Sequence, residues 1–148
     1  MDDFERIRQA GTGNFTEIWL VKSREDESKQ YALKIVEKQK VTRLRKQNDI
    51  LMEKHCLNKL KDCEYVVQLH ETFKDEINVY LLMEFVDGGE LWSKIKNCGL
   101  FSKDVILYYF CQILKAIQQI HQKGIVHRDI KVRKWLKIVQ IFFWRNFA

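Results

Sequence analysis

The stretch that decides the fold is "QYALKIVEK", Gln30–Lys38. Its side chains alternate with a period of two, which is typical of a β-strand. One face carries Tyr31, Leu33 and Ile35, and the other carries Ala32, Lys34 and Val36. Lys34 thus shares a face with apolar residues, although taken alone it would be interpreted as a surface lysine.

The segment that follows, Val41 to Leu60, is helical in pattern. Ile50, Glu53, Leu57 and Leu60 follow the spacing i, i+3, i+7, i+10, which places them on one stripe of a helix. A carboxylate on an apolar stripe costs several kcal/mol unless it is paired with a cation. Lys34 is the natural partner for Glu53.

Upstream, two short apolar stretches, Phe4–Ile7 and Ile18–Lys22, flank "AGTGNF" and predict a hairpin that turns through glycines. "GTGNFTEI" also has the pattern G-x-G-x-x-T-x-I. Glycines let a backbone approach a phosphate chain, because no Cβ blocks it and amide N–H groups can face anionic oxygens. In isolation, an ordinary glycine hairpin is the favoured interpretation.

Downstream, "YVVQLHETF" and "NVYLLMEFV" predict two more strands, which brings the number of strands to five. Ser102 is the expected N-cap of a helix over Lys103–Gln122. The predicted buried face of that helix carries Ile106, Phe110, Ile113, Ile117 and Ile120. Strands followed by helices predict an α+β chain of two packed units, with any ligand in the crevice between them.

The composition predicts a folded globular protein. The chain has 148 residues, of which 46% are hydrophobic and 31% are charged. It shows neither an apolar leader at its start nor a run of 18 apolar residues, so we expect no secretion, no membrane partner and a cytoplasmic location, with the nucleus as the alternative. The four cysteines lack zinc spacing and are expected to be reduced thiols, most of them packing residues.

The charge distribution argues against a nucleic-acid partner. The net charge is +6, and residues 127–148 contribute about +5 of it, with six basic residues against one acidic residue. The body of the chain is therefore nearly neutral. Nucleic-acid binding needs basic residues interleaved with aromatic ones along a folded face, a mixture that only the tail offers.

The motifs described above, taken together in their order along the chain, indicate one kind of protein far more specifically than any of them does alone. A glycine-rich turn, a strand lysine in "YALK", an inward helix glutamate and "HRD" at 127–129, after a long helix, form the protein-kinase signature set. This order argues against a fold that uses the residues for packing alone. Over Phe4 to Lys131 the chain resembles the eukaryotic protein kinase family, Ser/Thr type, most closely the cyclic-nucleotide-dependent kinases. "FERIRQAGTGNF", "MEKHCL", "MEFVDGGEL" and "GIVHRDIK" carry the resemblance as well.

The resemblance implies an α+β protein-kinase-like fold with ATP as cofactor and a protein as substrate. It implies a five-stranded antiparallel small lobe with helix C at 1–83, a hinge at 84–89 and the start of a helical large lobe at 90–131. It also implies a nucleotide site. Around the phosphates the resemblance places Ala10, Gly11, Thr12, Gly13 and Asn14, and it places Lys34, paired with Glu53, on the α/β-phosphates. Around the adenine it places Ile18 and Ala32, with Met83 as gatekeeper and with Glu84 and Val86 at the adenine edge. Glu90 would contact the ribose.

The resemblance also implies roles in the loop after the long helix. His127 and Arg128 would brace the loop, Asp129 would accept the proton of the substrate hydroxyl, and Lys131 would steady the transferring phosphoryl group. A lysine two residues after the aspartate resembles the Ser/Thr-kinase pattern rather than the tyrosine-kinase one.

Three departures from the family pattern weaken the expectation of activity. Thr16 replaces the third glycine of the turn, and a β-branched residue there stiffens it. Lys134 stands where H-R-D-x-x-x-x-N has its magnesium-binding asparagine, and a cation would repel the metal ion. No D-F-G follows Lys131 in the sequence. The Mg²⁺ expected for the family therefore has no assigned ligand here.

Residues 132–148, "VRKWLKIVQIFFWRNFA", form an atypical apolar and basic tail that fits no family element. We hypothesise that the reading frame has slipped, because codons permitted for Val139–Asn146 can encode a stretch close to D-F-G-L-A in another frame. If the tail is genuine, its apolar run predicts a site for a partner protein or a tendency to aggregate.

The expected function is that of a protein serine/threonine kinase, which transfers the γ-phosphoryl group of ATP to Ser or Thr hydroxyls. We expect this chain alone to be inactive or nearly so. The alternative is a truncated or pseudokinase-like module that binds nucleotide or a partner without catalysis. A nucleic-acid binder that acts through its basic tail is a third hypothesis.

Overall fold

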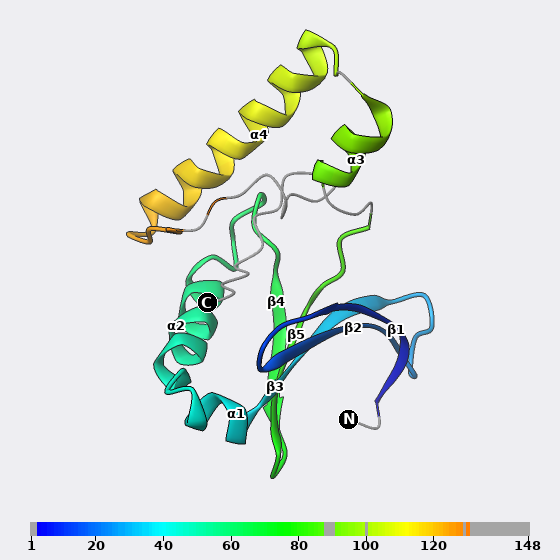
Figure 1. The fold of residues 1–148 in the computed structure, drawn as a ribbon, viewed down its shortest axis with the longest axis vertical. Coiled ribbons are helices and arrows are strands. Elements are labelled where there is room, and N and C mark those ends of the chain that lie inside the picture. Colours follow the sequence, from blue (N-terminus) through cyan, green and yellow to red (C-terminus); the bar gives the residue numbers. More distant parts are fainter. Residues whose placement is uncertain (1–2, 88–90, 100, 129, 131–148) are drawn as a thin grey trace. The chain divides into compact units, whose positions relative to one another are not determined.

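The computed structural model describes residues 3–87, 91–99, 101–128 and 130 of the chain. Its elements are shown in Figure 1. In chain order they are β1 (Phe4–Thr12), β2 (Thr16–Ser23), β3 (Gln30–Glu37), α1 (Lys38–Arg43), α2 (Gln47–Lys59), β4 (Leu69–Lys74), β5 (Asn78–Glu84), α3 (Leu91–Cys98) and α4 (Lys103–Gln122).

The strands form one five-stranded sheet in the order β1-β2-β3-β5-β4, and every neighbouring pair is antiparallel. This confirms the predicted five-stranded antiparallel sheet and the α+β class. The central strand is β3, which corresponds to the strand predicted at Gln30–Lys38. Residues 32–36 of this strand are all buried, since it has a strand on each side and side chains packed on both of its faces.

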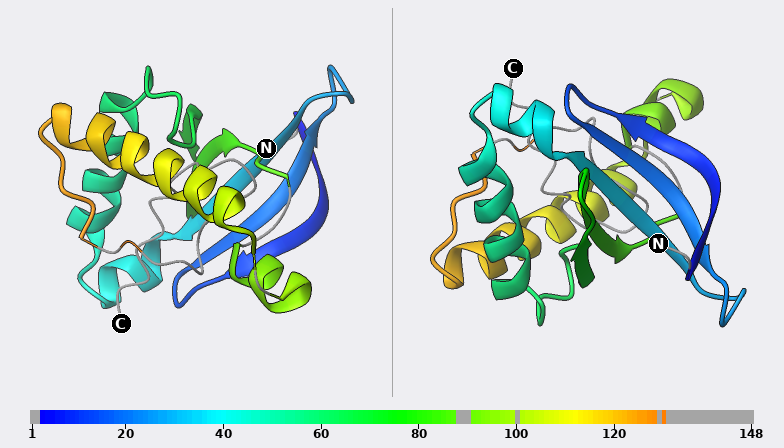
Figure 2. Two further views of the ribbon diagram at one scale, coloured as in Figure 1. Left: turned by 90° about the horizontal axis from the view of Figure 1, so that it is seen from above. Right: turned by 90° about the horizontal axis from the view of Figure 1, so that it is seen from below.

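The sheet curls, so that its two edge strands approach each other. Phe4 of β1 stacks on Phe73 of β4 with ring centroids 6.4 Å apart, although three strands separate β1 from β4 in the sheet. The curved β1–β2 ribbon is visible in Figures 1 and 2. The curled face encloses a core of Val21, Leu33, Ile35, Tyr80 and Leu82, with Phe4, Trp19, Tyr31 and Phe73 packed against it.

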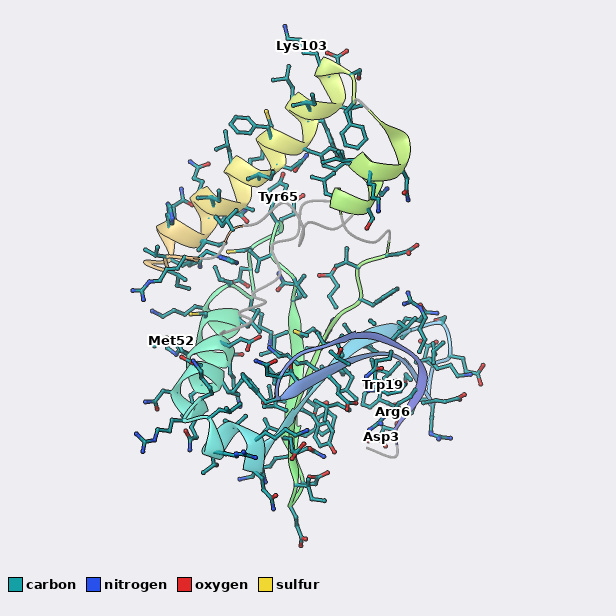
Figure 3. The ribbon with its side chains drawn as sticks, in the orientation of Figure 1. Asp3, Arg6, Trp19, Met52, Tyr65 and Lys103 are labelled. Atoms are coloured by element: carbon teal, nitrogen blue, oxygen red, sulfur yellow. The ribbon has the colours of Figure 1, made fainter. Side chains whose placement is uncertain are left out.

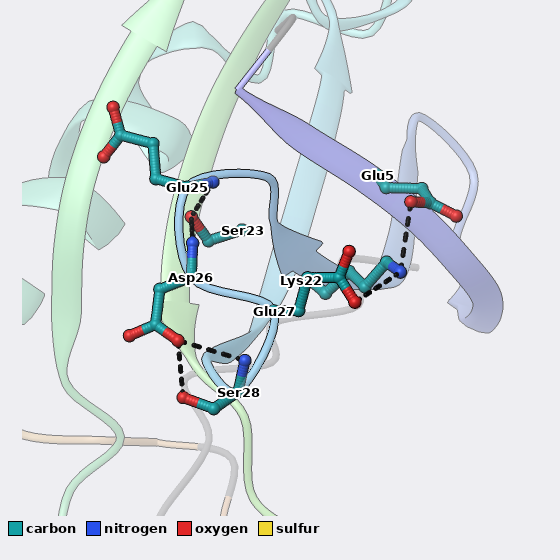
Figure 4. A network of polar contacts seen from close by, with 7 residues as sticks. All are labelled: Glu5, Lys22, Ser23, Glu25, Asp26, Glu27 and Ser28. Atoms are coloured by element: carbon teal, nitrogen blue, oxygen red, sulfur yellow. Dashed lines mark hydrogen bonds and ion pairs between the residues drawn. The ribbon is translucent and has the colours of Figure 1, made fainter.

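Side chains close the turn between β2 and β3 (Figure 4). The Ser23 hydroxyl accepts the backbone N–H groups of Glu25 and Asp26, at 3.2 and 3.3 Å. Asp26 accepts the hydroxyl of Ser28 at 2.6 Å, and this bond is the main reason that the pKa of Asp26 lies below its ordinary value. These local bonds satisfy backbone donors that the sheet does not reach.

Strand boundaries differ from the prediction at the first hairpin and at the start of β4. β1 continues to Thr12 and β2 starts at Thr16, so the glycine hairpin is tighter than the sequence suggested. β4 begins at Leu69 and not at Tyr65. The amide of Gln68 donates to the carbonyl oxygens of Cys63 and Val66, at 2.8 and 2.7 Å, and these bonds replace strand pairing before Leu69.

The predicted helix over Val41–Leu60 is two helices, α1 and α2. Arg45 has a φ of 53°, in the left-handed region, and the N–H of Lys46 donates to the carbonyl oxygen of Val41 at 2.9 Å. A left-handed residue followed by such a backward bond closes a helix. The stripe predicted on the second helix is confirmed, with Leu57 and Leu60 buried and Ile50 half-buried.

The helix α4 begins as predicted at the N-cap Ser102, whose hydroxyl accepts the N–H of Val105 at 3.4 Å. Its buried face was predicted only in part. Ile113, Ile117 and Ile120 pack into the core, but Ile106 and Phe110 are each 54% exposed. The covered stripe is centred on Tyr109, Ala116 and Ile120, and Ile106 and Phe110 lie to one side of it.

The described residues divide into two compact units. The first unit comprises 3–55 and 69–85, and the second comprises 56–68, 86–87, 91–99, 101–128 and 130. A ligand crevice between them stays a prediction. The core of the second unit contains Cys56, Leu60, Cys63, Val66, Leu91, Ala116, Ile120 and Ile125.

Two predictions on composition can be compared with the structure. Cys56 and Cys63 are buried thiols, and burial raises the pKa of Cys63, whereas Cys111 is exposed. Most of the cysteines that the structure describes therefore serve packing, as expected. Among the described residues, every helix is too short or too polar to span a bilayer.

Candidate functional site

The predicted site starts at the turn between β1 and β2. Gly11 pairs with Ile18 across the hairpin, and the N–H of Gly13 donates to the carbonyl oxygen of Thr16 at 2.7 Å. Thr12 and Asn14 are exposed, as is Ala10 in the strand before them. Of the residues that the sequence assigned to phosphates, Ala10, Thr12 and Asn14 are thus exposed, and Gly11 and Gly13 are half-buried.

The centre of this turn is anchored by a residue that the sequence analysis did not single out. Phe15 is only 8% exposed, and its carbonyl oxygen accepts the N–H of Glu37 at 3.2 Å. This bond ties the turn to the end of β3. The sequence did contain a signal for this burial, because a large aromatic side chain within a polar, glycine-rich turn indicates that the side chain packs against the core.

Lys34 of β3 and Glu53 of α2 form the predicted ion pair. The ammonium Nζ lies 2.5 Å from Oε1 and 2.7 Å from Oε2 of the carboxylate. The side chains are only 4% and 11% exposed. A buried lysine and a buried glutamate are each costly alone, so the close contact with both oxygens accounts for the glutamate on the apolar stripe.

An apolar surface surrounds Lys34 on its face of the sheet. Lys34 pairs with Ile18 of β2, and Ala32 pairs with Met83 of β5. Directly opposed residues of antiparallel strands share a face, and so do residues two apart in one strand. The exposed fractions of Ile18, Ala32 and Met83 are 6%, 5% and 2%. The structure thus brings four predicted site residues together on one face.

The remaining predicted residues of the nucleotide site follow at the end of β5. Glu84 is the last residue of that strand and is half-buried, opposite Tyr31 of β3. Val86 is half-buried and belongs to the second unit. Glu90 lies outside the described residues.

The loop after α4 belongs to the second unit. α4 ends at Gln122 and is closed by Gly124, which has a φ of 71°, and by the N–H of Ile125, which donates to the carbonyl oxygen of Ile120 at 3.1 Å. Ile125 and His127 are each 8% exposed, so the loop is anchored at alternate residues. Asp129 and Lys131 lie outside the described residues.

Arg128 stands out in this loop. It is exposed and has a φ of 64°, in the left-handed region that non-glycine residues rarely adopt. Such outliers persist where neighbouring contacts enforce them, and they gather at functional sites.

Comparison with known proteins identifies the family. Residues 4–136 match the family described as protein kinase domain. The chain belongs to the protein kinase family. The sequence also resembles several curated protein kinases.

A cGMP-dependent protein kinase from Drosophila melanogaster, isozyme 2 forms cD5/T2, is 33% identical over 131 residues, which are 88% of this chain and 14% of that protein. The human cAMP-dependent protein kinase catalytic subunit PRKX is 38% identical over 132 residues, 88% of this chain and 36% of that kinase. The serine/threonine-protein kinase AtPK2/AtPK19 from Arabidopsis thaliana is 33% identical over 131 residues, 88% of this chain and 27% of that kinase.

These similarities confirm the predicted membership of the serine/threonine protein kinase family and the likeness to cyclic-nucleotide-dependent kinases. The chain spans only 14% to 36% of the length of the three curated kinases that it matches. Protein kinases use ATP and Mg²⁺ in general. Among the described residues, no group of three or more His, Cys, Asp or Glu side chains could hold a metal ion.

Proposed function

We propose that this chain is the nucleotide-binding part of an ATP-dependent protein serine/threonine kinase. One observation carries the proposal, namely the buried Lys34–Glu53 ion pair on an otherwise apolar face of the sheet. A fold that needed only a core would be served as well by two apolar residues, because a buried ion pair is weak support for stability.

Lys34 would hold the α/β-phosphates of ATP. An ammonium group has three N–H donors, and the two oxygens of Glu53 take up two of them. The third can reach a phosphate oxygen, while Glu53 keeps the side chain in place. Fixing one positive charge in advance lowers the cost of neutralising the triphosphate during transfer.

The surfaces around Lys34 fit the rest of the nucleotide. Ile18, Ala32 and Met83 offer an apolar platform for the adenine ring. Gly11 and Gly13 allow the turn to approach the phosphate chain without a Cβ in the way. Glu84 and Val86 would meet the adenine edge through backbone groups.

The loop after α4 would act on the protein substrate. Asp129 would accept the proton of the substrate hydroxyl, and Lys131 would steady the transferring phosphoryl group. The burial of His127 and the left-handed conformation of Arg128 support a loop whose backbone is held for function. The substrate is a Ser or Thr side chain of another protein, by relation to the matched kinases.

We propose further that this chain alone is inactive or nearly so. Lys134 occupies the place of the asparagine that binds Mg²⁺ in the family, and its positive charge would oppose the ion. Whether residues 132–148 represent a shift of the reading frame is a matter for the gene and transcript sequences.

Thermal unfolding in the presence of ATP tests the nucleotide site. We expect ATP to raise the unfolding temperature of the full chain, because a ligand that binds only the folded state stabilises it. Lys34→Met should abolish this rise. Lys54→Met, which removes the same charge from an exposed position of α2, should retain it. An equal rise in both variants would contradict the proposed role of Lys34.

A radiolabel-transfer assay with magnesium-ATP tests the inactivity. We expect no turnover above that of the Asp129→Asn variant. Turnover that Asp129→Asn abolishes would show an active kinase and would refute the proposed effect of Lys134.

The second candidate function is a pseudokinase-like module that binds nucleotide without catalysis. The charge of Lys134 at the expected metal-ligand position favours it. This candidate predicts stabilisation by ATP that is the same with and without Mg²⁺. Stabilisation that requires Mg²⁺ would favour a site built for catalysis.

A further inference from the structure

The first unit contains a cavity that shares Thr12 and Gly13 with the proposed nucleotide site and is otherwise lined by residues that the proposed function does not use. Its volume is about 270 Å³. A cavity of about 150 Å³ is enough to bind benzene in an engineered protein, so this cavity has room for one ring and a polar substituent. It is lined by Arg6, Thr12, Gly13, Phe15, Thr16, Glu17, Ile35, Glu37, Lys40 and Asn78.

The cavity lies on the side of the sheet away from Lys34. Ile35 follows Lys34 in β3, and successive residues of a strand point to opposite faces. Ile35 belongs to the core that the curled face encloses. The cavity therefore opens next to the interior of the curled sheet, a common position for small-molecule sites in closed β-structures.

The wall combines an apolar part with charged groups. Phe15 and Ile35 are each 8% exposed and offer apolar atoms for packing. Glu37 already forms an ion pair with Lys40, at 2.7 Å. Glu17 accepts the indole N–H of Trp19 at 2.9 Å. Both carboxylates of the wall are thus engaged by donors of the protein.

Arg6 is the cation of this wall that remains available. Its guanidinium carbon lies 5.1 Å from the centre of the Trp19 ring (Figure 3), and the described residues place no carboxylate within ion-pair distance of it. A ring contact of this kind orients the guanidinium plane and leaves its N–H edge for a ligand. That edge matches the two oxygens of a carboxylate.

We propose that this cavity binds a small organic acid consisting of one ring-sized apolar body and one carboxylate. The ring packs against Phe15 and Ile35, and the carboxylate binds Arg6 through two N–H groups. The hydroxyls of Thr12 and Thr16 line the same cavity and can donate to the acid.

An occupant would contact the glycine-rich turn directly. Thr12, Gly13 and Phe15 belong to that turn and also line the cavity. The inference does not depend on ATP binding, because every group invoked lies on the wall of this cavity.

A titration followed by two-dimensional NMR of the isotope-labelled full chain tests the site, with benzoate as the probe. We expect saturable shifts of the amide signals of Gly13, Thr16 and Ile35. Benzamide has nearly the same shape and no charge, so it should bind about tenfold more weakly or worse. Equal affinities of the two probes, or no saturable shift at these amides, would overturn the proposal.

A pair of arginine variants locates the carboxylate. Arg6→Gln should weaken benzoate about tenfold, because it removes the guanidinium fork. Arg24→Gln makes the same change of charge at an exposed position outside the cavity wall and should leave the affinity unchanged. Binding that Arg6→Gln leaves intact would show that Arg6 does not hold the carboxylate. Equal weakening by both variants would show that the net charge, and not this site, attracts the acid.

Discussion

At the scale of single residues, Lys34 and Glu53 belong to the proposed nucleotide site and also contribute to the fold. Their contact at 2.5 and 2.7 Å joins β3 to α2, and both side chains are nearly removed from water. Two buried charges attract each other strongly where the dielectric constant is low, but each pays a large desolvation cost. The pair therefore stabilises the fold only as long as both partners are present.

Removing one partner should be costly. Glu53→Gln keeps the shape of the side chain but leaves the Lys34 ammonium buried without a counter-charge. We expect the free energy of unfolding to fall by about 3 kcal/mol. Urea denaturation followed by circular dichroism measures it.

Two controls accompany this prediction. Glu27→Gln removes a carboxylate that is 78% exposed beside Lys22 and should change the stability by less than about 0.5 kcal/mol. The double variant Lys34→Met with Glu53→Leu should be more stable than Glu53→Gln, since it leaves no buried charge. A double variant no more stable than Glu53→Gln would refute this account of the pair.

At the scale of elements, the β4–β5 hairpin is held by one carboxylate. Asp75 accepts the hydroxyl of Tyr80 at 2.6 Å and the N–H groups of Ile77 and Asn78 at 2.8 and 2.6 Å. The bond from Tyr80, followed by those from the backbone, holds the pKa of Asp75 below its ordinary value. Lys38, at the start of α1, donates to the backbone carbonyl oxygen of Asp75 and ties this helix to the hairpin.

The hairpin should make stability depend on acid pH. The pKa of Asp75 is lower in the folded state than its ordinary value of 3.8, so its contribution is present above 3.8 and is lost as the pH falls through the folded pKa. Tyr80→Phe removes the main cause of the shift. We expect the variant to lose less stability than the parent protein between pH 5 and pH 2, roughly the window in which a carboxylate of lowered pKa titrates.

The measurement is the urea midpoint of both proteins across this range. Tyr108→Phe is the matched control, because Tyr108 is 51% exposed on α4. It should show the acid dependence of the parent protein. If Tyr80→Phe lost stability in acid as steeply as the parent, Asp75 would not be the group responsible.

At the scale of the whole molecule, the described residues include a hydrophobic core in each of the two units. One lies within the curled sheet, and the other joins the segment 56–66 to α3 and α4. α2 contributes to both units, because its residues up to His55 belong to the first and those from Cys56 to the second. Units that each have their own core often unfold locally as separate cooperative units.

Hydrogen exchange should resolve the two units. Ile120 is fully buried in the second core, and Ile120→Ala should cost about 3 kcal/mol. We expect amide protection to fall mainly in α4 and in 56–66. Leu33→Ala, at a fully buried position of the first core, should act mainly on β2, β3 and β5. A uniform loss of protection in both variants would show a single cooperative unit.

Much of the fold and of the site could be predicted from short patterns. The alternation around Lys34 predicted the central strand, and the helical stripe around Glu53 predicted its partner, because side-chain periods report which residues share a face. The order of the motifs then indicated the protein kinase family. Predictions for Glu90, Asp129 and Lys131 stay predictions, since these residues lie outside those that the structure describes.

The sequence by itself thus determined the five strands in their order along the chain, the buried charge pair and the family. Only the tertiary structure decided the left-handed break at Arg45, the burial of Phe15, the exposure of Ile106 and Phe110, and the cavity beside Arg6. The reason is that a local pattern tells which side chains face the same way, whereas burial depends on what distant segments place against that face. Phe15 is an example, because the N–H group that binds its carbonyl oxygen belongs to Glu37, the last residue of β3, which is distant from Phe15 in the sequence.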